Sequence, residues 1–164
     1  TDHRSLIDQA LVLHHANQLD EALKLYQRVL DSAPDNTETL TLVASLYLQQ
    51  NKLDISKNIF DKALALDDKN VLTLHNYALL LERLNRNDDA IAYLDAALKI
   101  HPKYEDAYKH KANVLKKIGK LDLAIETYQL AEKQLACSAD FYFRFSNHLR
   151  DAERHQEALE AIDK

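Results

Sequence analysis

The chain repeats itself every 34 residues, and this period limits what it can fold into more than any other feature. The stretch 85–102 reads NRNDDAIAYLDAALKIHP, an amphipathic pattern that opens on Asn and Asp and closes on proline. The stretches 17–34, 51–68 and 119–136 carry similar residue types at the same places, and a further copy begins at Glu153. A fixed period of this length is the signature of a protein that stacks one small supersecondary motif many times.

Small residues recur twice in each repeat, at positions that predict close contact between two helices. The first set is Ala22, Ser56, Ala90, Ala124 and Ala158, and the second set, twelve positions earlier, is Ala10, Ala44, Ala78, Ala112 and Ser146. Larger side chains there would overpack the contact. Four positions after the first set come Tyr26, Phe60, Leu94, Tyr128 and Ile162, which are expected to fill the space between helices. The apolar residues recur at steps of three, four and seven, the period of an α-helix.

Turn and capping residues recur with the same period. Asn17, Asn51, Asn85 and Gly119 recur where the first helix of each repeat must end, and these residue types tolerate a left-handed backbone. Asp20, Asp54, Asp88 and Asp122 are predicted to cap the second helix, and Asn36, Asn70 and Ser138 the first helix of the next repeat. The predicted helices are 3–16, 20–33, 37–50, 54–67, 71–84, 88–101, 105–118, 122–135, 139–152 and 155–164.

The spacing of small and large residues, the proline that closes a repeat and the 34-residue period resemble the tetratricopeptide repeat. The resemblance covers the whole chain and implies an all-α fold, a right-handed α-α superhelix (solenoid) of antiparallel helix pairs. It implies one domain over residues 1–164, with repeats near 3–36, 37–70, 71–104, 105–138 and a truncated 139–164. We expect this chain to be a fragment of a longer protein. Ser56 and Asp68 depart from the family pattern, which has a small Ala and a proline there.

Composition argues against several classes of function. A net charge of −5 argues against general nucleic-acid binding, and no apolar run is long enough to span a bilayer. One glycine leaves no phosphate-binding loop, and no HExxH motif or His pair four residues apart predicts a metal site. We therefore expect no enzymatic activity and no cofactor. The lone Cys137 excludes an internal disulfide and favours a reducing compartment such as the cytoplasm.

The resemblance also implies where a partner binds, because the first helices of the repeats line the concave groove in this family. The polar residues predicted there are His75, Asn76, Lys109, His110, Asn113, Lys116, Arg144 and Asn147, and the apolar ones are Ile7, Leu11, Leu42, Leu48, Leu72 and Leu79. Residues 101–120 hold six Lys against two acidic residues. This balance suits a peptide with an acidic segment, the alternative being an ordinary solvated helix face.

Two binding modes of the family require particular residues at these positions. Some members hold a C-terminal carboxylate with a Lys and an Asn four residues apart, and Lys109 and Asn113 match that pair. Arg144 stands where the next Asn of this clamp would be, so the match is partial. Other members carry an asparagine ladder along the groove, but only Asn76 fits it here.

Three hypotheses follow for the function. The first is a scaffold that binds a protein or peptide in its groove, with no nucleic-acid or membrane partner. The second is the substrate-recruiting arm of a larger, transferase-type enzyme whose catalytic domain lies outside the chain. The third is self-association through exposed end helices, since Ala158, Leu159 and Ile162 lie on the side where another repeat would pack.

Overall fold

A computed structural model describes residues 2–164, and these residues form ten α-helices and no strand. The helices are α1 (His3–His15), α2 (Leu19–Ser32), α3 (Thr37–Gln49), α4 (Leu53–Leu66), α5 (Val71–Arg83), α6 (Asn87–Ile100), α7 (Glu105–Lys117), α8 (Leu121–Gln134), α9 (Ala139–Asp151) and α10 (His155–Ile162). Every predicted helix is present, with ends within two residues of the prediction. The all-α class is therefore confirmed.

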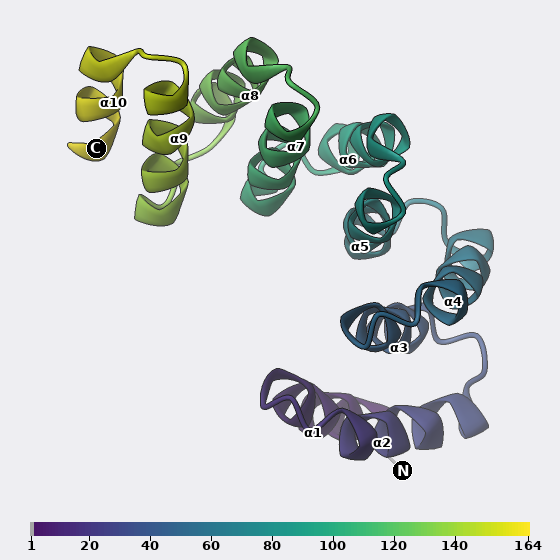
Figure 1. The fold of residues 1–164 in the computed structure, drawn as a ribbon. Helices are drawn as coiled ribbons and strands as arrows, with labels where there is room; N and C mark the ends of the chain where they lie inside the picture. The colour runs from purple at the N-terminus through teal and green to yellow at the C-terminus, as the bar shows by residue number, and fades with distance from the viewer. Residues whose placement is uncertain (1) are drawn as a thin grey trace. The chain divides into compact units, whose positions relative to one another are not determined.

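The chain divides into two compact units, Thr1–Leu80 and Leu81–Lys164, which we call unit 1 and unit 2. In unit 1, α1 pairs with α2, α3 pairs with α4, and α2 also packs against α3. In unit 2, α7 pairs with α8 and α9 with α10, while α6 packs against α7 and α8 against α9 (Figure 1). Within each unit, the second helix of one hairpin thus supports the first helix of the next. No helix of the described residues has the length and apolarity to cross a membrane.

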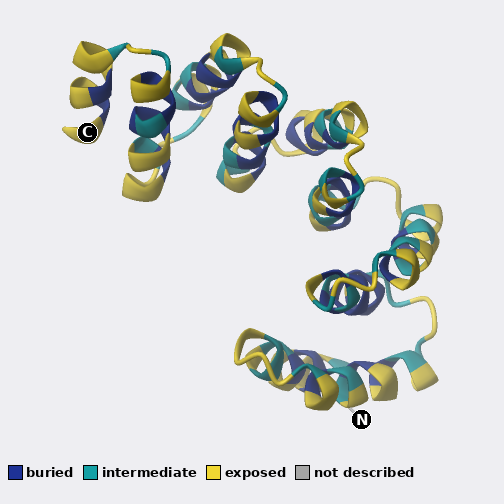
Figure 2. Cartoon of the chain, in the orientation of Figure 1, coloured by how far each residue is buried: buried dark blue, intermediate teal, exposed yellow. Residues whose placement is uncertain are grey.

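The small residues of the repeat lie in the helix contacts, as predicted. All ten are buried, and the side chains of Tyr26, Phe60, Leu94 and Tyr128 fill the adjoining space. Ser56, which departs from the family pattern, is accommodated because its hydroxyl donates a hydrogen bond to the carbonyl of Ala44 at 2.7 Å. Figure 2 shows buried residues along one side of the helices and exposed residues along the other. Burial therefore follows the helical period of the sequence.

Each hairpin turn uses one residue with a left-handed backbone, and the four predicted positions are confirmed. Asn17, Asn51 and Asn85 have φ values of 60°, 59° and 58°, and Gly119 has a φ of 78°. The fifth such residue, Glu153 at 59°, was not predicted. The residue after each one donates its amide to the carbonyl five residues earlier, as Gln18 does to Leu13 at 2.9 Å. This is the Schellman arrangement that closes a helix.

The capping predictions divide into two groups. Asn36 and Asn70 cap α3 and α5 by accepting the amides of Thr39 at 2.8 Å and Thr73 at 3.0 Å, and Ser138 caps α9 in the same way. The predicted caps at Asp20, Asp54, Asp88 and Asp122 are wrong, because the second helices begin earlier, at Leu19, Leu53, Asn87 and Leu121. The aspartates lie inside the first turn instead, where a negative charge favours the positive end of the helix dipole.

Candidate functional site

The polar residues predicted to bind a partner lie on three first helices. His75 and Asn76 lie on the part of α5 that belongs to unit 1, and the others lie on α7 and α9 of unit 2. In unit 1, Asn76 donates its side-chain amide to the hydroxyl of Ser45 on α3 at 3.0 Å. Beside it, the buried hydroxyls of Thr41 and Thr73 share a hydrogen bond of 2.6 Å. Asn76 thus helps to join α3 to α5, and His75 is half-buried on the same helix.

The apolar positions predicted for the groove are only partly exposed. Ile7, Leu42 and Leu48 are buried, so the prediction that they line an open surface is wrong. Counting in heptads assigns one inward stripe per helix, but it ignores the neighbouring helices that cover parts of that stripe. Leu11 is half-buried, whereas Leu72 and Leu79 on α5 are exposed. Among the six predicted apolar positions, the exposed ones are therefore the two leucines of α5.

Lys109 of unit 2 is held by three carboxylates of its own chain. Its Nζ lies 3.1 Å from Glu105, 2.9 Å from Asp106 and 3.0 Å from Asp140, and its side chain is only 15% exposed. Burial by itself lowers the pKa of Lys109, but hydrogen bonds to Asp106, Asp140 and Glu105 outweigh burial and raise it above its ordinary value. Lys109 is therefore always charged and already neutralised within the protein.

The other predicted cations have carboxylate partners as well. The ammonium of Lys116 contacts the carboxylate of Asp151, and the guanidinium of Arg144 lies 2.9 Å from Asp140. Lys117, which belongs to the same lysine-rich stretch, lies 3.2 Å from Glu82. The positive charge read from residues 101–120 is thus largely balanced by carboxylates brought in from α5 and α9. Asn113, four residues after Lys109, is exposed.

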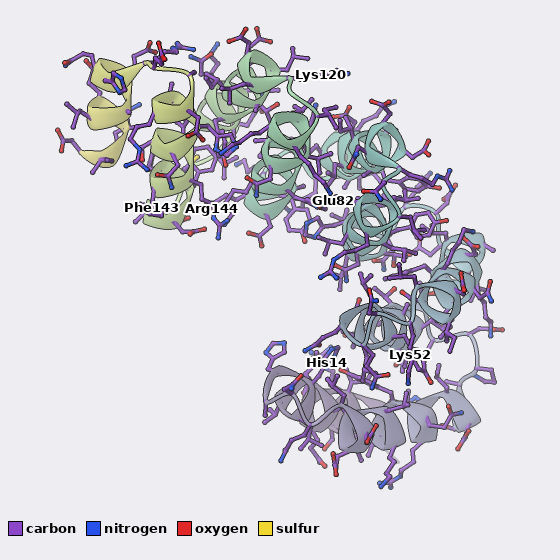
Figure 3. The ribbon with its side chains drawn as sticks, in the orientation of Figure 1. His14, Lys52, Glu82, Lys120, Phe143 and Arg144 are labelled. Atoms are coloured by element: carbon purple, nitrogen blue, oxygen red, sulfur yellow. The ribbon has the colours of Figure 1, made fainter. Side chains whose placement is uncertain are left out.

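His110 is a buried packing group in unit 2. Its Nε2 lies 3.0 Å from a carboxylate oxygen of Glu82. Burial lowers the pKa of His110, and the opposing effect of Glu82 is smaller, so the imidazole is neutral near pH 7 and Nε2–H donates to the carboxylate. Burial raises the pKa of Glu82, but hydrogen bonds from His110 and Lys117 outweigh it and lower that pKa. The pair joins α7 to the end of α5, and Figure 3 labels Glu82 there.

Phe143, the most exposed aromatic side chain of α9, is not among the residues predicted from the sequence to bind a partner. It is 62% exposed and stands next to Arg144 at the same end of the helix (Figure 3). Its counterparts one and two repeats earlier are Lys109 and His75, which were both assigned to the binding face. An aromatic residue at that position of the repeat was therefore a usable signal. Asn147, one turn further on, accepts a hydrogen bond from Arg150.

A second surface of unit 2 was also not anticipated. A hollow of about 350 Å³ lies between α6, α7 and α8, and its apolar lining includes Ile91, Leu115, Leu123 and Leu130. Leu123 and Leu130 are exposed on α8, seven residues apart. Lys120 lies at its edge, in the turn between α7 and α8 (Figure 3). Among the residues that the structure describes, no group of three or more His, Cys, Asp or Glu is arranged to hold a metal ion.

Comparison with known proteins places these hairpins in context. Two family models described as "Tetratricopeptide repeat" match residues 13–84 and 71–114. No curated protein matches the chain.

Solved structures with the same fold cover nearly the whole chain. PilF of Pseudomonas aeruginosa is 17% identical with a TM-score of 0.86, over 98% of this chain and 73% of that one. PilW, described as a widely conserved type IV pilus biogenesis factor, is 21% identical with a TM-score of 0.83, over 98% and 74%. YrrB, described as a protein with an unusual peptide-binding site, is 23% identical with a TM-score of 0.65, over 96% and 81%. These likenesses show the fold, an all-α solenoid of helix pairs.

Proposed function

Because the chain belongs to the tetratricopeptide repeat family, we propose that it is a non-catalytic scaffold that binds a peptide or protein segment along the first helices of its hairpins. One observation carries the proposal. These helices keep exposed side chains that the stacking of hairpins does not use, and the most prominent is Phe143. Large apolar side chains left open beside polar ones are typical of interaction surfaces.

The exposed residues of unit 2 suit an extended peptide segment. Phe143 offers a flat apolar surface for a side chain of the partner, and the amide of the exposed Asn113 can donate to and accept from a peptide backbone. The half-buried Asn147 accepts a hydrogen bond from Arg150 and keeps its amide N–H groups as donors. Arg144 adds a guanidinium that is half exposed. Because Asp140 already balances part of its charge, we expect only a modest preference for an acidic segment.

The remaining predicted residues act indirectly in this proposal. Lys109, His110 and Lys116 hold α7 against its neighbours, and Asn76 does the same for α5. We propose that they fix the spacing of the helices that present the contact residues. In unit 1, the contact residues are His75 and the exposed Leu72 and Leu79.

A peptide selected from a random display library against this chain provides the probe for a test. Its affinity is measured by fluorescence anisotropy for the wild type and for a Phe143→Ala, Asn147→Ala double variant. We expect about a tenfold loss of affinity, since interface residues that matter contribute roughly 1–2 kcal/mol. The matched control is Leu123→Ala, Leu130→Ala, which removes two exposed leucines from α8. Unchanged binding by the first variant, or an equal loss in the control, would refute the proposed site.

A further inference from the structure

The hollow between α6, α7 and α8 of unit 2 keeps an exposed apolar lining although its helices are packed against their neighbours. α6 packs against α7, α7 against α8 and α8 against α9. Leu123 and Leu130 on α8 are nevertheless 47% and 48% exposed, and Ile91 on α6 is half-buried and lines the same hollow. The stacking of hairpins therefore does not explain why these three residues are apolar.

In unit 1, a lysine of the chain itself covers part of the corresponding surface. Tyr47 occupies the position of Leu115, two repeats earlier, and the ammonium of Lys52 lies 5.6 Å from the centre of its ring. A lysine in such a contact covers apolar surface with its stem while its charge remains solvated. In unit 2, Leu115 offers no ring, and Lys120, the counterpart of Lys52, lies 3.8 Å from Asp88 instead.

A second lysine of unit 1 stands where unit 2 has a leucine. Lys62 on α4 occupies the position of Leu130 and donates a hydrogen bond to the carbonyl of Pro34 at 2.8 Å. Its Nζ also lies 3.1 Å from the carboxylate of Asp35, so its stem reaches from α4 to the connector that precedes α3. A leucine cannot make this bridge. At both positions, unit 2 thus lacks an aliphatic stem with a positive end that unit 1 supplies from its own chain.

The charges around the hollow leave one carboxylate unbalanced. The ammonium of Lys111 lies 2.6 Å from Asp95, and that of Lys120 faces Asp88. Glu126 lies on α8 between the two exposed leucines and is itself exposed. Within residues 2–164, Glu126 has neither a hydrogen-bond partner nor an ion-pair partner. The edge of the hollow therefore attracts a cation.

We propose that this hollow binds an amphipathic helix of a partner protein, whose apolar side chains contact Leu123 and Leu130 and whose lysine or arginine pairs with Glu126. The two leucines are seven residues apart, about two turns or 10.5 Å of helix. A helix laid along α8 meets them with residues of its own at i, i+3 or i+4, and i+7, the usual spacing of anchors in a helix-binding groove.

The lining favours a helix over an extended segment. Its walls present apolar side chains, and the hydroxyl of Thr127 already donates to the carbonyl of Leu123 at 2.8 Å. An extended backbone in contact with these walls would lose its hydrogen bonds to water without replacing them. A helix satisfies its own backbone internally and needs only side-chain contacts.

This surface is separate from the one proposed above for a peptide, and the inference does not depend on that proposal. On α7, Lys111 and Leu115 line the hollow. Lys109 and Asn113, which belong to the binding face predicted from the sequence, are each offset from them by two residues. Two residues correspond to about 200° of rotation around an α-helix, so the two pairs lie on opposite sides of α7.

A display library of amphipathic helices supplies the probe. Each member has about 20 residues, long enough for more than five turns, with one face randomised. The library is selected on the wild-type chain and then counter-selected on the double variant Leu123→Glu, Leu130→Lys. Glu21 and Lys62 occupy these positions in other repeats, so the variant keeps the net charge and should keep the melting temperature measured by circular dichroism.

The recovered helices are expected to share apolar residues at i, i+3 or i+4, and i+7, with a lysine or arginine beside them. Their affinity, measured by fluorescence anisotropy, should fall at least about tenfold in the double variant. Phe143→Ala, Asn147→Ala is the matched control and should bind these helices like the wild type. Failure to recover any helix that distinguishes the wild type from the double variant would overturn the proposal, as would an equal loss in the control.

Two further measurements test the charge and the helix. Glu126→Gln should weaken binding about two- to fivefold at low salt, the range of an exposed ion pair, and the effect should shrink in about 1 M salt. A helix whose lysine is changed to glutamate should regain affinity for Glu126→Lys. Full affinity of Glu126→Gln at low salt would contradict the pairing. Proline at the centre of the probe should abolish binding, and retained binding would show an extended occupant and refute the helix.

Discussion

The contact between α3 and α5 in unit 1 and the contact between α7 and α9 in unit 2 use different chemistry on the same backbone pattern. Between α3 and α5, the buried hydroxyls of Thr41 and Thr73 form a neutral hydrogen bond. Between α7 and α9, Lys109 and Lys116 form ion pairs with Asp140 and Asp151. The repeat therefore determines which helices are in contact, whereas the type of interaction at each contact depends on the individual residues. Unit 1 should depend little on salt and pH at this contact, and unit 2 should depend on both.

The largest expected effect tests whether the two units are stabilised separately. Tyr128→Ala removes a fully buried ring that packs on three rings of α9, and should cost about 3–5 kcal/mol. In a repeat protein the loss is local, so hydrogen exchange should accelerate in α7–α10 more than in α1–α4. Tyr128→Phe keeps the ring and is the control. Equal acceleration in α1–α4 would show that the units unfold as one.

The neutral contact of unit 1 is broken by Thr41→Ala, which leaves the buried hydroxyl of Thr73 without this hydrogen bond. We expect a loss of about 1–3 kcal/mol in urea unfolding. The double variant Thr41→Val, Thr73→Val removes both hydroxyls and should restore most of the stability. Neither value should change between low and high salt. A marked dependence on salt would contradict the assignment of this contact as neutral.

The charged contact of unit 2 is broken by Lys109→Met. This change leaves three carboxylates without their shared cation, and we expect a loss of about 1–2 kcal/mol, between the values of exposed and buried ion pairs. The loss should shrink in about 1 M salt, where screening acts within a few ångströms. Thermal melts at several salt concentrations measure it. Lys57→Met, which breaks the more exposed pair with Asp61 in unit 1, is the matched control and should cost less.

Acid should weaken unit 2 more than unit 1. Burial lowers the pKa of His110 and His148 from 6.5, so the unfolded chain binds protons there before the folded chain does. The free energy of unfolding of unit 2 is therefore highest above about pH 6.5. It falls by on the order of 1 kcal/mol as the pH drops below that value. Unit 1 holds the half-buried His14, whose pKa burial also lowers. Hydrogen exchange measured separately for each unit at about pH 7 and 5.5 tests this. The double variant His110→Gln, His148→Gln should lose the pH dependence of unit 2.

The smallest expected effect is a gain in stability from a substitution at the last hairpin turn. Glu153 has a φ of 59°, a left-handed conformation in which a glutamate is strained and an asparagine much less so. Glu153→Asn should stabilise α9 and α10 by about 0.5–1 kcal/mol. Gly119→Ala should cost a similar amount at the matching turn of unit 2, because its φ of 78° disfavours a Cβ. Thermal melts of both variants check the two signs.

The turns and the caps of the first helices were predicted correctly because interactions between residues close in sequence determine them. The left-handed residues at 17, 51, 85 and 119 and the caps at Asn36 and Asn70 depend on a few neighbouring backbone groups. The aspartate caps were wrong because each aspartate lies two residues after the actual N-cap. The second helices start directly after the left-handed residue and its successor, so Asp20 and its counterparts already lie inside the helix.

The burial and charge pairing of side chains on the first helices were predicted less well. Lys109 and Asp140 are 31 residues apart, and Lys116 and Asp151 are 35 apart, so their pairing depends on how neighbouring hairpins stack. A charge count along one helix cannot include carboxylates from the next, and the lysine-rich stretch therefore seemed more positive than the structure makes it. The burial of Ile7 and Leu42 was missed for the same reason.

The hairpin turns also determine where this architecture accepts additional chain. Each turn is closed by paired main-chain hydrogen bonds around one left-handed residue, such as Asn51 to Leu48 and Lys52 to Tyr47. An inserted residue would displace that geometry and separate the two helices. The connectors between hairpins, such as 33–36 and 67–70, contain no left-handed residue. Epitope tags, fluorophore sites or whole inserted domains are best placed in these connectors, where they leave the hairpins intact.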